Sequence, residues 1–154
     1  MSSTGNPDDA CPMGEAPGKC ELDANIEVLR LQPAFSAIPL PRLKLYAYVA
    51  KRVQYRAGEF LFRQGQGDDR GYIVLSGKAV VSRDYRDHSV RLNELTAGEF
   101  FGGIALLADV NRLFSVQALT ALECLTLDRS SFQKLLIQFP ETALKVLEVM
   151  IRRI

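Results

Sequence analysis

The chain has 154 residues, of which 47% are hydrophobic and 24% charged, with a formal net charge of +1. This composition is ordinary for one soluble globular domain, and it excludes the strongly basic surface that draws a protein to nucleic acid or an acidic membrane. Because no stretch approaches the ~18 apolar residues of a membrane span and the N-terminus lacks a secretory signal, we expect a cytoplasmic protein with reduced thiols and no membrane partner.

The N-terminal part of the chain is predicted to be a tail followed by helices. Residues 1–20 are rich in Ser, Gly, Pro and Asp and hold few large apolar groups, so we expect them to form a disordered tail. Residues 21–48 carry two amphipathic patterns. The first has Asp23 as a candidate N-cap, and Pro39 and Pro41 bracket the start of the second. These patterns predict two N-terminal helices.

The middle of the chain, residues 49–128, is predicted to be β-structure. Short alternating apolar runs are separated by turns that contain glycine. The stretch from Tyr72 to Leu75 is wholly apolar and predicts a central strand, whereas Ala79 to Arg83 predicts an edge-like strand. The regular spacing indicates a double-stranded β-helix, or jelly-roll, barrel of about eight strands. The expected domain spans residues 21–154 and is mainly β with flanking α-helices.

Residues 129–154 are predicted to form two C-terminal helices. Asp128 or Ser130 is a suitable N-cap for the first helix, and Pro140 separates it from the second. Apolar residues recur along the second helix at spacings of three, four and three, at Leu144, Leu147, Ile151 and Ile154. A single apolar stripe would dock on the barrel, whereas a second stripe predicts a homodimer through this face.

The cysteines do not form a recognisable metal motif. Cys11 and Cys20 lie in the expected tail, and Cys124 lies in an alternating run that faces the core. A zinc site would need all three cysteines and His88 to converge from distant segments. We therefore expect no metal site. The two cysteines in the tail are expected to be free thiols.

The most informative stretch runs from Phe101 to Val116. Gly102 and Gly103 allow a tight turn and a close approach to a ligand, and Ile104 to Leu107 would follow as one helical turn. Arg112 is placed to close over an anion at this turn, with the Ser115 hydroxyl beside it. The alternative is a surface turn with an ordinary solvated arginine.

This stretch resembles the phosphate-binding cassette of the cyclic nucleotide-binding domain family, which includes the catabolite activator protein and other CRP/FNR-like effector domains. The residues that match the family pattern are Phe101, Gly102, Ala105, Leu106, Arg112, Ser115 and Val116. The segment from Gly58 to Val81 resembles the first strands of the same family. The resemblance implies a jelly-roll regulatory, or sensor, domain for signal transduction, with cAMP or cGMP as the possible ligand and no further cofactor.

The ligand-binding residues implied by the resemblance are Gly102, Gly103, Ile104, Ala105, Arg112, Phe114 and Ser115. The cassette departs from the family pattern at two of them. Gly103 stands where the family has the glutamate that binds the ribose 2′-hydroxyl, and Phe114 stands where the family has a small residue.

The sequence does not indicate an enzyme. It contains one histidine and shows no nucleophile–base pair at local spacing and no metal motif, so no catalytic residue is expected. Two alternatives to a cyclic nucleotide sensor stay open. The chain is a degenerate, ligand-free interaction or dimerisation module in which Phe114 fills the pocket, or it is the effector part of a transcription regulator that lacks its own DNA-binding domain. In each case we expect no direct contact of this chain with nucleic acid.

Overall fold

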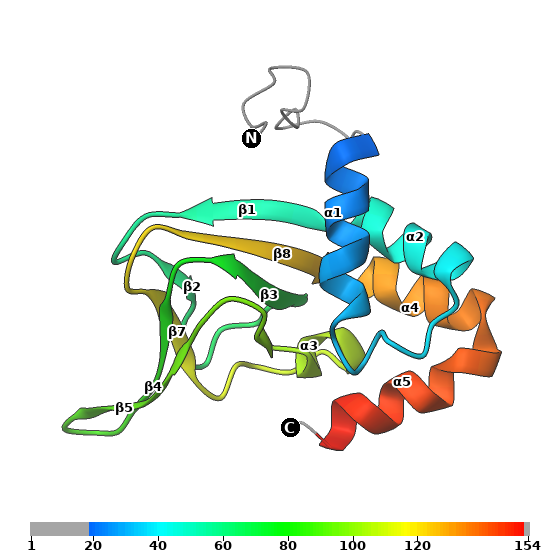
Figure 1. The fold of residues 1–154 in the computed structure, drawn as a ribbon. Coiled ribbons are helices and arrows are strands. Elements are labelled where there is room, and N and C mark those ends of the chain that lie inside the picture. The colour runs from blue at the N-terminus through cyan, green and yellow to red at the C-terminus, as the bar shows by residue number, and fades with distance from the viewer. Residues whose placement is uncertain (1–18, 153–154) are drawn as a thin grey trace, which may run out of the picture.

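The computed structural model describes residues 19–152, which form two β-sheets with helices before, between and after the strands (Figure 1). The helices in this part of the chain are α1 (Lys19–Arg30), α2 (Leu40–Val49), α3 (Ile104–Leu107), α4 (Arg129–Gln138) and α5 (Pro140–Arg152). The strands are β1 (Lys51–Tyr55), β2 (Phe60–Phe62), β3 (Arg70–Ser76), β4 (Ala79–Asp84), β5 (Ser89–Leu95), β6 (Phe100–Phe101), β7 (Ser115–Ala118) and β8 (Leu122–Asp128).

The strands form two four-stranded antiparallel sheets, in the orders β1-β8-β3-β6 and β2-β7-β4-β5. The predicted mainly-β jelly roll with two helices at each end is confirmed, as an open pair of sheets that does not close into a barrel. Strand β3 lies between β8 and β6, as expected for a wholly apolar run.

The prediction that β4 is an edge strand is wrong. It pairs with both β5 and β7, and β5 forms the edge of that sheet. Strand β7 comes from a distant part of the chain. The polarity pattern within β4 therefore could not predict that the two strands pair.

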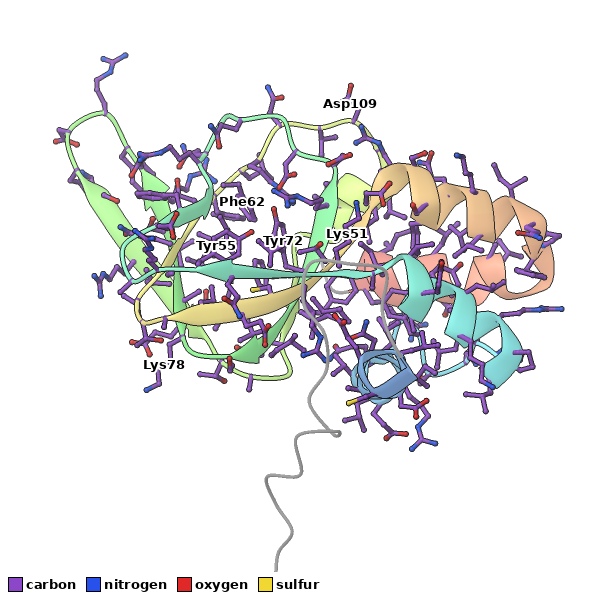
Figure 2. The ribbon with its side chains drawn as sticks, turned by 90° about the horizontal axis from the view of Figure 1, so that it is seen from above. Lys51, Tyr55, Phe62, Tyr72, Lys78 and Asp109 are labelled. Carbon is purple, nitrogen blue, oxygen red and sulfur yellow. The ribbon has the colours of Figure 1, made fainter. Side chains whose placement is uncertain are left out.

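Two hydrophobic clusters hold the elements together. One joins the helices to the β1–β8–β3 sheet, which explains why the helices gather at one end of the strands when seen from above (Figure 2). Its centre is Phe35, whose ring lies 5.7 Å from Tyr46 and 6.2 Å from Phe132 in edge-on geometry. The other cluster lies between the two sheets and includes Phe62 and Cys124. Cys124 is fully buried, as predicted, and burial raises its pKa to about 12.

The helix starts were predicted with mixed success. Asp128 caps α4, because its carboxylate accepts a hydrogen bond of 3.0 Å from the backbone N–H of Ser131. Asp23 is not an N-cap, since α1 already begins at Lys19, inside the expected tail; no glycine or proline interrupts the chain there. Cys20 belongs to α1 and is disulfide-bonded, so the expectation of a free thiol is wrong for this residue. Cys11 lies outside the described residues.

The last helix, α5, is only partly covered by the rest of the domain. Val146 is fully buried and Leu147 packs against the helical cluster, whereas Leu144 and Ile151 are 82% and 61% exposed. The expected apolar face is therefore divided between the core and the surface, and Ile154 lies outside the described residues. Across residues 19–152, no helix combines the length and apolar character needed to cross a membrane.

Candidate functional site

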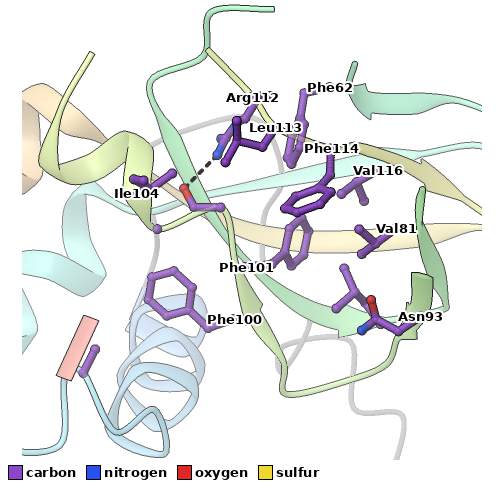
Figure 3. Close-up of a pocket in the computed structure, with 14 residues that line it drawn as sticks. Phe62, Val81, Asn93, Phe100, Phe101, Ile104, Arg112, Leu113, Phe114 and Val116 are labelled. Carbon is purple, nitrogen blue, oxygen red and sulfur yellow. Dashed lines mark hydrogen bonds between the residues drawn. The ribbon is translucent and has the colours of Figure 1, made fainter. Parts of the chain in front are cut away.

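A cavity of about 370 Å³ opens between the inner face of the β2–β7–β4–β5 sheet and the segment that follows β6 (Figure 3). It is lined by Ala34, Phe62, Val81, Asn93, Leu95, Phe100, Phe101, Gly102, Gly103, Ile104, Arg112, Leu113, Phe114 and Val116. Among these lining residues only Asn93 and Arg112 carry polar side chains. The cavity is therefore largely apolar, with one positively charged side chain, that of Arg112, in its wall. Small-molecule sites in proteins usually take this form.

The structure brings five of the seven predicted site residues to this cavity: Gly102, Gly103, Ile104, Arg112 and Phe114. The other two are engaged elsewhere. Ala105 is fully buried and its N–H donates to the Gly102 carbonyl at 3.2 Å, so it is not free for a phosphate. The buried Ser115 hydroxyl accepts a hydrogen bond of 2.9 Å from the backbone N–H of Gln64.

Only the first glycine of the pair has a glycine-specific conformation. Gly102 has a φ of +75°, and a Cβ atom there would lie 2.9 Å from Nη1 of Arg112. Gly102 is thus needed both for the turn and for the close approach of the arginine. Gly103 has a φ of −62° in the helical region, so a side chain at this position is compatible with the backbone.

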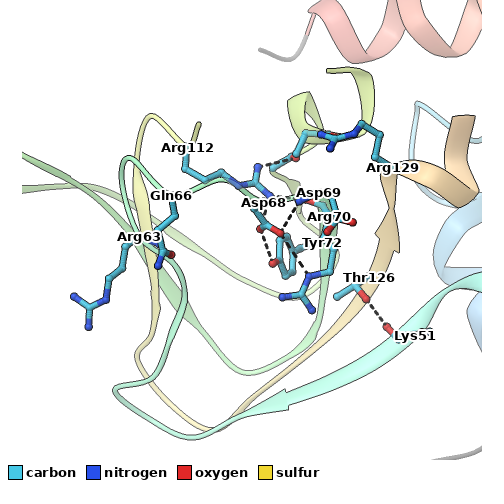
Figure 4. Close-up of polar contacts among 12 residues, drawn as sticks. Lys51, Arg63, Gln66, Asp68, Asp69, Arg70, Tyr72, Arg112, Thr126 and Arg129 are labelled. Carbon is cyan, nitrogen blue, oxygen red and sulfur yellow. Dashed lines mark hydrogen bonds and ion pairs between the residues drawn. The ribbon is translucent and has the colours of Figure 1, made fainter. Parts of the chain in front are cut away.

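Arg112 is buried, with 3% of its side chain exposed, and most of its donors already have partners (Figure 4). Its Nη2 atom lies 2.8 Å from Oδ2 of Asp68 and also donates to the Arg70 carbonyl, and Nη1 donates to the Gly102 carbonyl at 2.9 Å. The guanidinium carbon lies 4.0 Å from the centre of the Phe62 ring. Within residues 19–152, its buried Nε atom has no hydrogen-bond partner. The positive charge is thus largely compensated inside the protein.

Backbone hydrogen bonds between two loops place Arg112 beside Asp68. The N–H of Gly65 donates to the Arg112 carbonyl at 2.7 Å, and the N–H of Arg112 donates to the Gln66 carbonyl at 2.8 Å. A β-bridge between Gly67 and Asn111 extends this pairing. The loop before β3 and the loop before β7 therefore meet, although Asp68 and Arg112 are 44 residues apart in the sequence.

Asp68 is a residue of the candidate site that the sequence did not reveal, because it lies in a polar loop with no distinctive motif. Its carboxylate accepts a hydrogen bond of 2.9 Å from the Tyr72 hydroxyl as well as that from Arg112. Burial acts to raise the pKa of Asp68, but the hydrogen bonds from Arg112 and Tyr72 outweigh it and hold the pKa below its usual value. Asp68 therefore stays ionised and neutralises Arg112.

Phe114 borders the cavity without filling it. Its side chain is 36% exposed, and the cavity volume remains open beside it. The guanidinium carbon of Arg83 lies 5.8 Å from the centre of the Phe114 ring.

A jelly roll with a cavity at a glycine turn and a buried arginine has a shape that suits a small molecule. The family model described as "Cyclic nucleotide-binding domain" matches residues 52–139, and the chain belongs to this family. The family that the cassette resembles is thereby confirmed.

Relatives of the chain include a cAMP-dependent protein kinase regulatory subunit and a cGMP-dependent protein kinase. The chain is 39% identical over 87 residues to a cAMP-dependent protein kinase regulatory subunit of Dictyostelium discoideum, which covers 54% of this chain and 27% of the relative. It is 30% identical over 123 residues to a cGMP-dependent protein kinase, isozyme 1, of Drosophila melanogaster, which covers 77% of this chain and 16% of the relative. The chain spans about a quarter or less of the length of these relatives.

Solved structures support the same fold. The N-terminal domain of a transcriptional regulator from Streptomyces coelicolor is 30% identical with a TM-score of 0.73, covering 82% of this chain and 89% of that one. The regulatory domain of Toxoplasma gondii PKA, solved with cAMP, has a TM-score of 0.75 at 21% identity, covering 86% of this chain and 49% of that one. Because the Toxoplasma gondii domain is only 21% identical to this chain, its match shows a similar fold and nothing further. The chain is thus a cyclic nucleotide-binding domain by family, and over this region it is similar to a kinase regulatory subunit and to a domain of a transcriptional regulator.

Proposed function

We propose that this chain is a sensor domain that binds a cyclic nucleotide such as cAMP, or a related anionic ligand, and acts through binding and not through catalysis. The observation that carries the proposal is the open cavity bounded by the Gly102–Ile104 turn and by Arg112. Family membership supports it, since relatives over the same region include a cAMP-dependent protein kinase regulatory subunit and a cGMP-dependent protein kinase.

The cavity as it stands favours weak binding of a cyclic nucleotide. A phosphate in it must share Arg112 with Asp68, and a ribose meets Gly103 where the family offers a carboxylate. The loss of one charge-assisted hydrogen bond costs about 1.5–3 kcal/mol, which corresponds to a roughly ten- to hundredfold loss of affinity.

Restoring the family residues should strengthen cAMP binding. We expect the double variant Gly103→Glu with Phe114→Ala to bind cAMP about ten- to hundredfold more tightly than the wild type, because the glutamate accepts from the ribose hydroxyl and the alanine widens the rim. Arg112→Ala should abolish binding. Isothermal titration calorimetry with cAMP and cGMP measures both effects, with circular dichroism to confirm that each variant is folded. Absence of binding by wild type and double variant alike would contradict the proposal.

A second role, as a homodimerisation module, is favoured by the exposed apolar side chains of α5. Leu144 and Ile151 are seven residues apart, and both project from the helix surface with little cover. We propose that they form the centre of a self-complementary contact between two copies of the chain.

Charge placed on this face should yield a folded monomer. We expect Leu144→Lys with Ile151→Lys to shift the sedimentation coefficient from dimer to monomer at micromolar concentration; Leu147 is left unchanged because it packs against the core. Ile137→Lys, at a 79% exposed position on α4, is the matched control and should remain dimeric. A wild-type chain that sediments as a monomer would refute the dimer.

A further inference from the structure

We propose that Asn93 recognises the base of the ligand, and that its amide makes the cavity select a cyclic nucleotide with adenine over one with guanine. This inference rests on the proposed function and names the base that the same site prefers. It depends on the way strand β5 directs Asn93 into the cavity, on the free state of the amide and on the apolar character of the surrounding wall.

A β-bulge brings Asn93 to the cavity. Ser82 pairs with Arg91 across β4 and β5, whereas the next pair along the two strands is Val81 with Asn93. Leu92 is therefore an extra residue without a partner opposite it. Paired residues project on the same face of a sheet, and Val81 and Asn93 both line the cavity. In a regular strand Leu92 would stand opposite Val81, so the bulge puts an amide where an apolar side chain is expected.

The amide of Asn93 is free to meet a ligand. Asn93 is exposed, and within residues 19–152 its side chain forms no hydrogen bond with the protein. Figure 3 shows it at the opposite end of the cavity from Arg112, with Phe101 and Val116 between them. A cyclic nucleotide whose phosphate lies at Arg112 would therefore direct its base along the phenylalanine rings toward Asn93.

One neutral amide suits adenine better than guanine. Besides Arg112, Asn93 carries the only polar side chain among the lining residues, so the base must find its polar partner there. An amide offers a donor and an acceptor side by side, which matches the amino group of adenine and the ring nitrogen next to it. Guanine carries a carbonyl, a ring N–H and an amino group, and one amide cannot serve all three. A polar group left without a partner against an apolar wall costs binding free energy.

Cyclic nucleotides that differ only in the base test this assignment by isothermal titration calorimetry. We expect the wild type to bind cAMP at least about fivefold more tightly than cGMP. It should also bind cAMP about two- to tenfold more tightly than the cyclic phosphate of purine riboside, which lacks the 6-amino group. Asn93→Leu should abolish this second preference, because neither base then has an amide partner. Glu94→Leu is the matched control and should keep it, since this exposed neighbour projects on the opposite face of β5.

The outcomes separate this inference from the proposed function. If the wild type binds cGMP as tightly as cAMP, or if Asn93→Leu keeps the preference for the 6-amino base, the inference is wrong while the sensor function stands. If neither the wild type nor the Gly103→Glu, Phe114→Ala variant binds any nucleotide, both fail. Asn93→Ala removes the amide without adding apolar bulk and should give the same result as Asn93→Leu, and circular dichroism confirms that each variant is folded.

Discussion

Replacing Asp68 with alanine should lower the free energy of unfolding by about 3–5 kcal/mol, because it leaves the Arg112 guanidinium buried without a counter-charge. Both side chains are nearly inaccessible, with exposed fractions of 10% for Asp68 and 3% for Arg112, so water cannot replace the lost carboxylate. The Tyr72 hydroxyl loses its acceptor in the same change. Urea unfolding followed by circular dichroism measures the loss.

The neighbouring carboxylate provides the control. Asp69 is exposed, and Asp69→Ala should change the stability by no more than about 0.5 kcal/mol. Equal stabilities of the two variants would show that the buried pair of Asp68 and Arg112 does not stabilise the fold as we expect.

The same pair makes a pH-dependent contribution to stability. Since the pKa of Asp68 is lower in the folded protein than in the unfolded chain, its contribution is complete above the unfolded value of about 3.9 and is lost as the pH falls through the folded value. The wild type should therefore lose stability more steeply than Asp68→Ala below about pH 4.

Replacing Gly77 with alanine should lower the free energy of unfolding by about 2–5 kcal/mol. Gly77 turns the chain between β3 and β4 with a φ of +89°, a conformation that costs an L-residue about 1–2 kcal/mol. A Cβ atom would also lie 2.1 Å from the carbonyl oxygen of Ala121 and 2.9 Å from Cα of Leu122. These are backbone atoms, so the clash is relieved only by moving the start of β8, at a further cost of about 1–3 kcal/mol.

The variant Gly98→Ala separates the backbone strain of a positive φ from the steric clash with neighbouring backbone atoms. Gly98 has a φ of +90°, but a Cβ atom there would meet nothing within 4 Å. We expect a loss of only about 1–2 kcal/mol, from the backbone strain alone. Chemical denaturation of both variants gives the difference, and equal losses would show that the contact with Ala121 does not matter.

Much of the fold was predictable because it depends on local patterns. The wholly apolar run of β3, the capping aspartate before α4 and the prolines at the start of α2 each act within a few residues. The glycine turn and arginine of the cassette were also found in this way, and the structure brings five of the seven expected site residues to one cavity. The misplaced edge strand and the misplaced N-cap of α1 arose where a distant partner or an uninterrupted helix overrode the local signal.

By itself, the sequence determined the fold class, the family and the presence of an arginine beside a glycine turn, since residue type and spacing carry this information. Only the tertiary structure decided what that arginine contacts. The loops before β3 and β7 pair through their backbones and bring Asp68 against Arg112, which compensates the charge expected to face a ligand. The same packing leaves Phe114 at the rim beside Arg83 and an apolar wall behind it. Charge compensation depends on distances of a few ångströms between segments far apart in the chain, which spacing along the sequence does not encode.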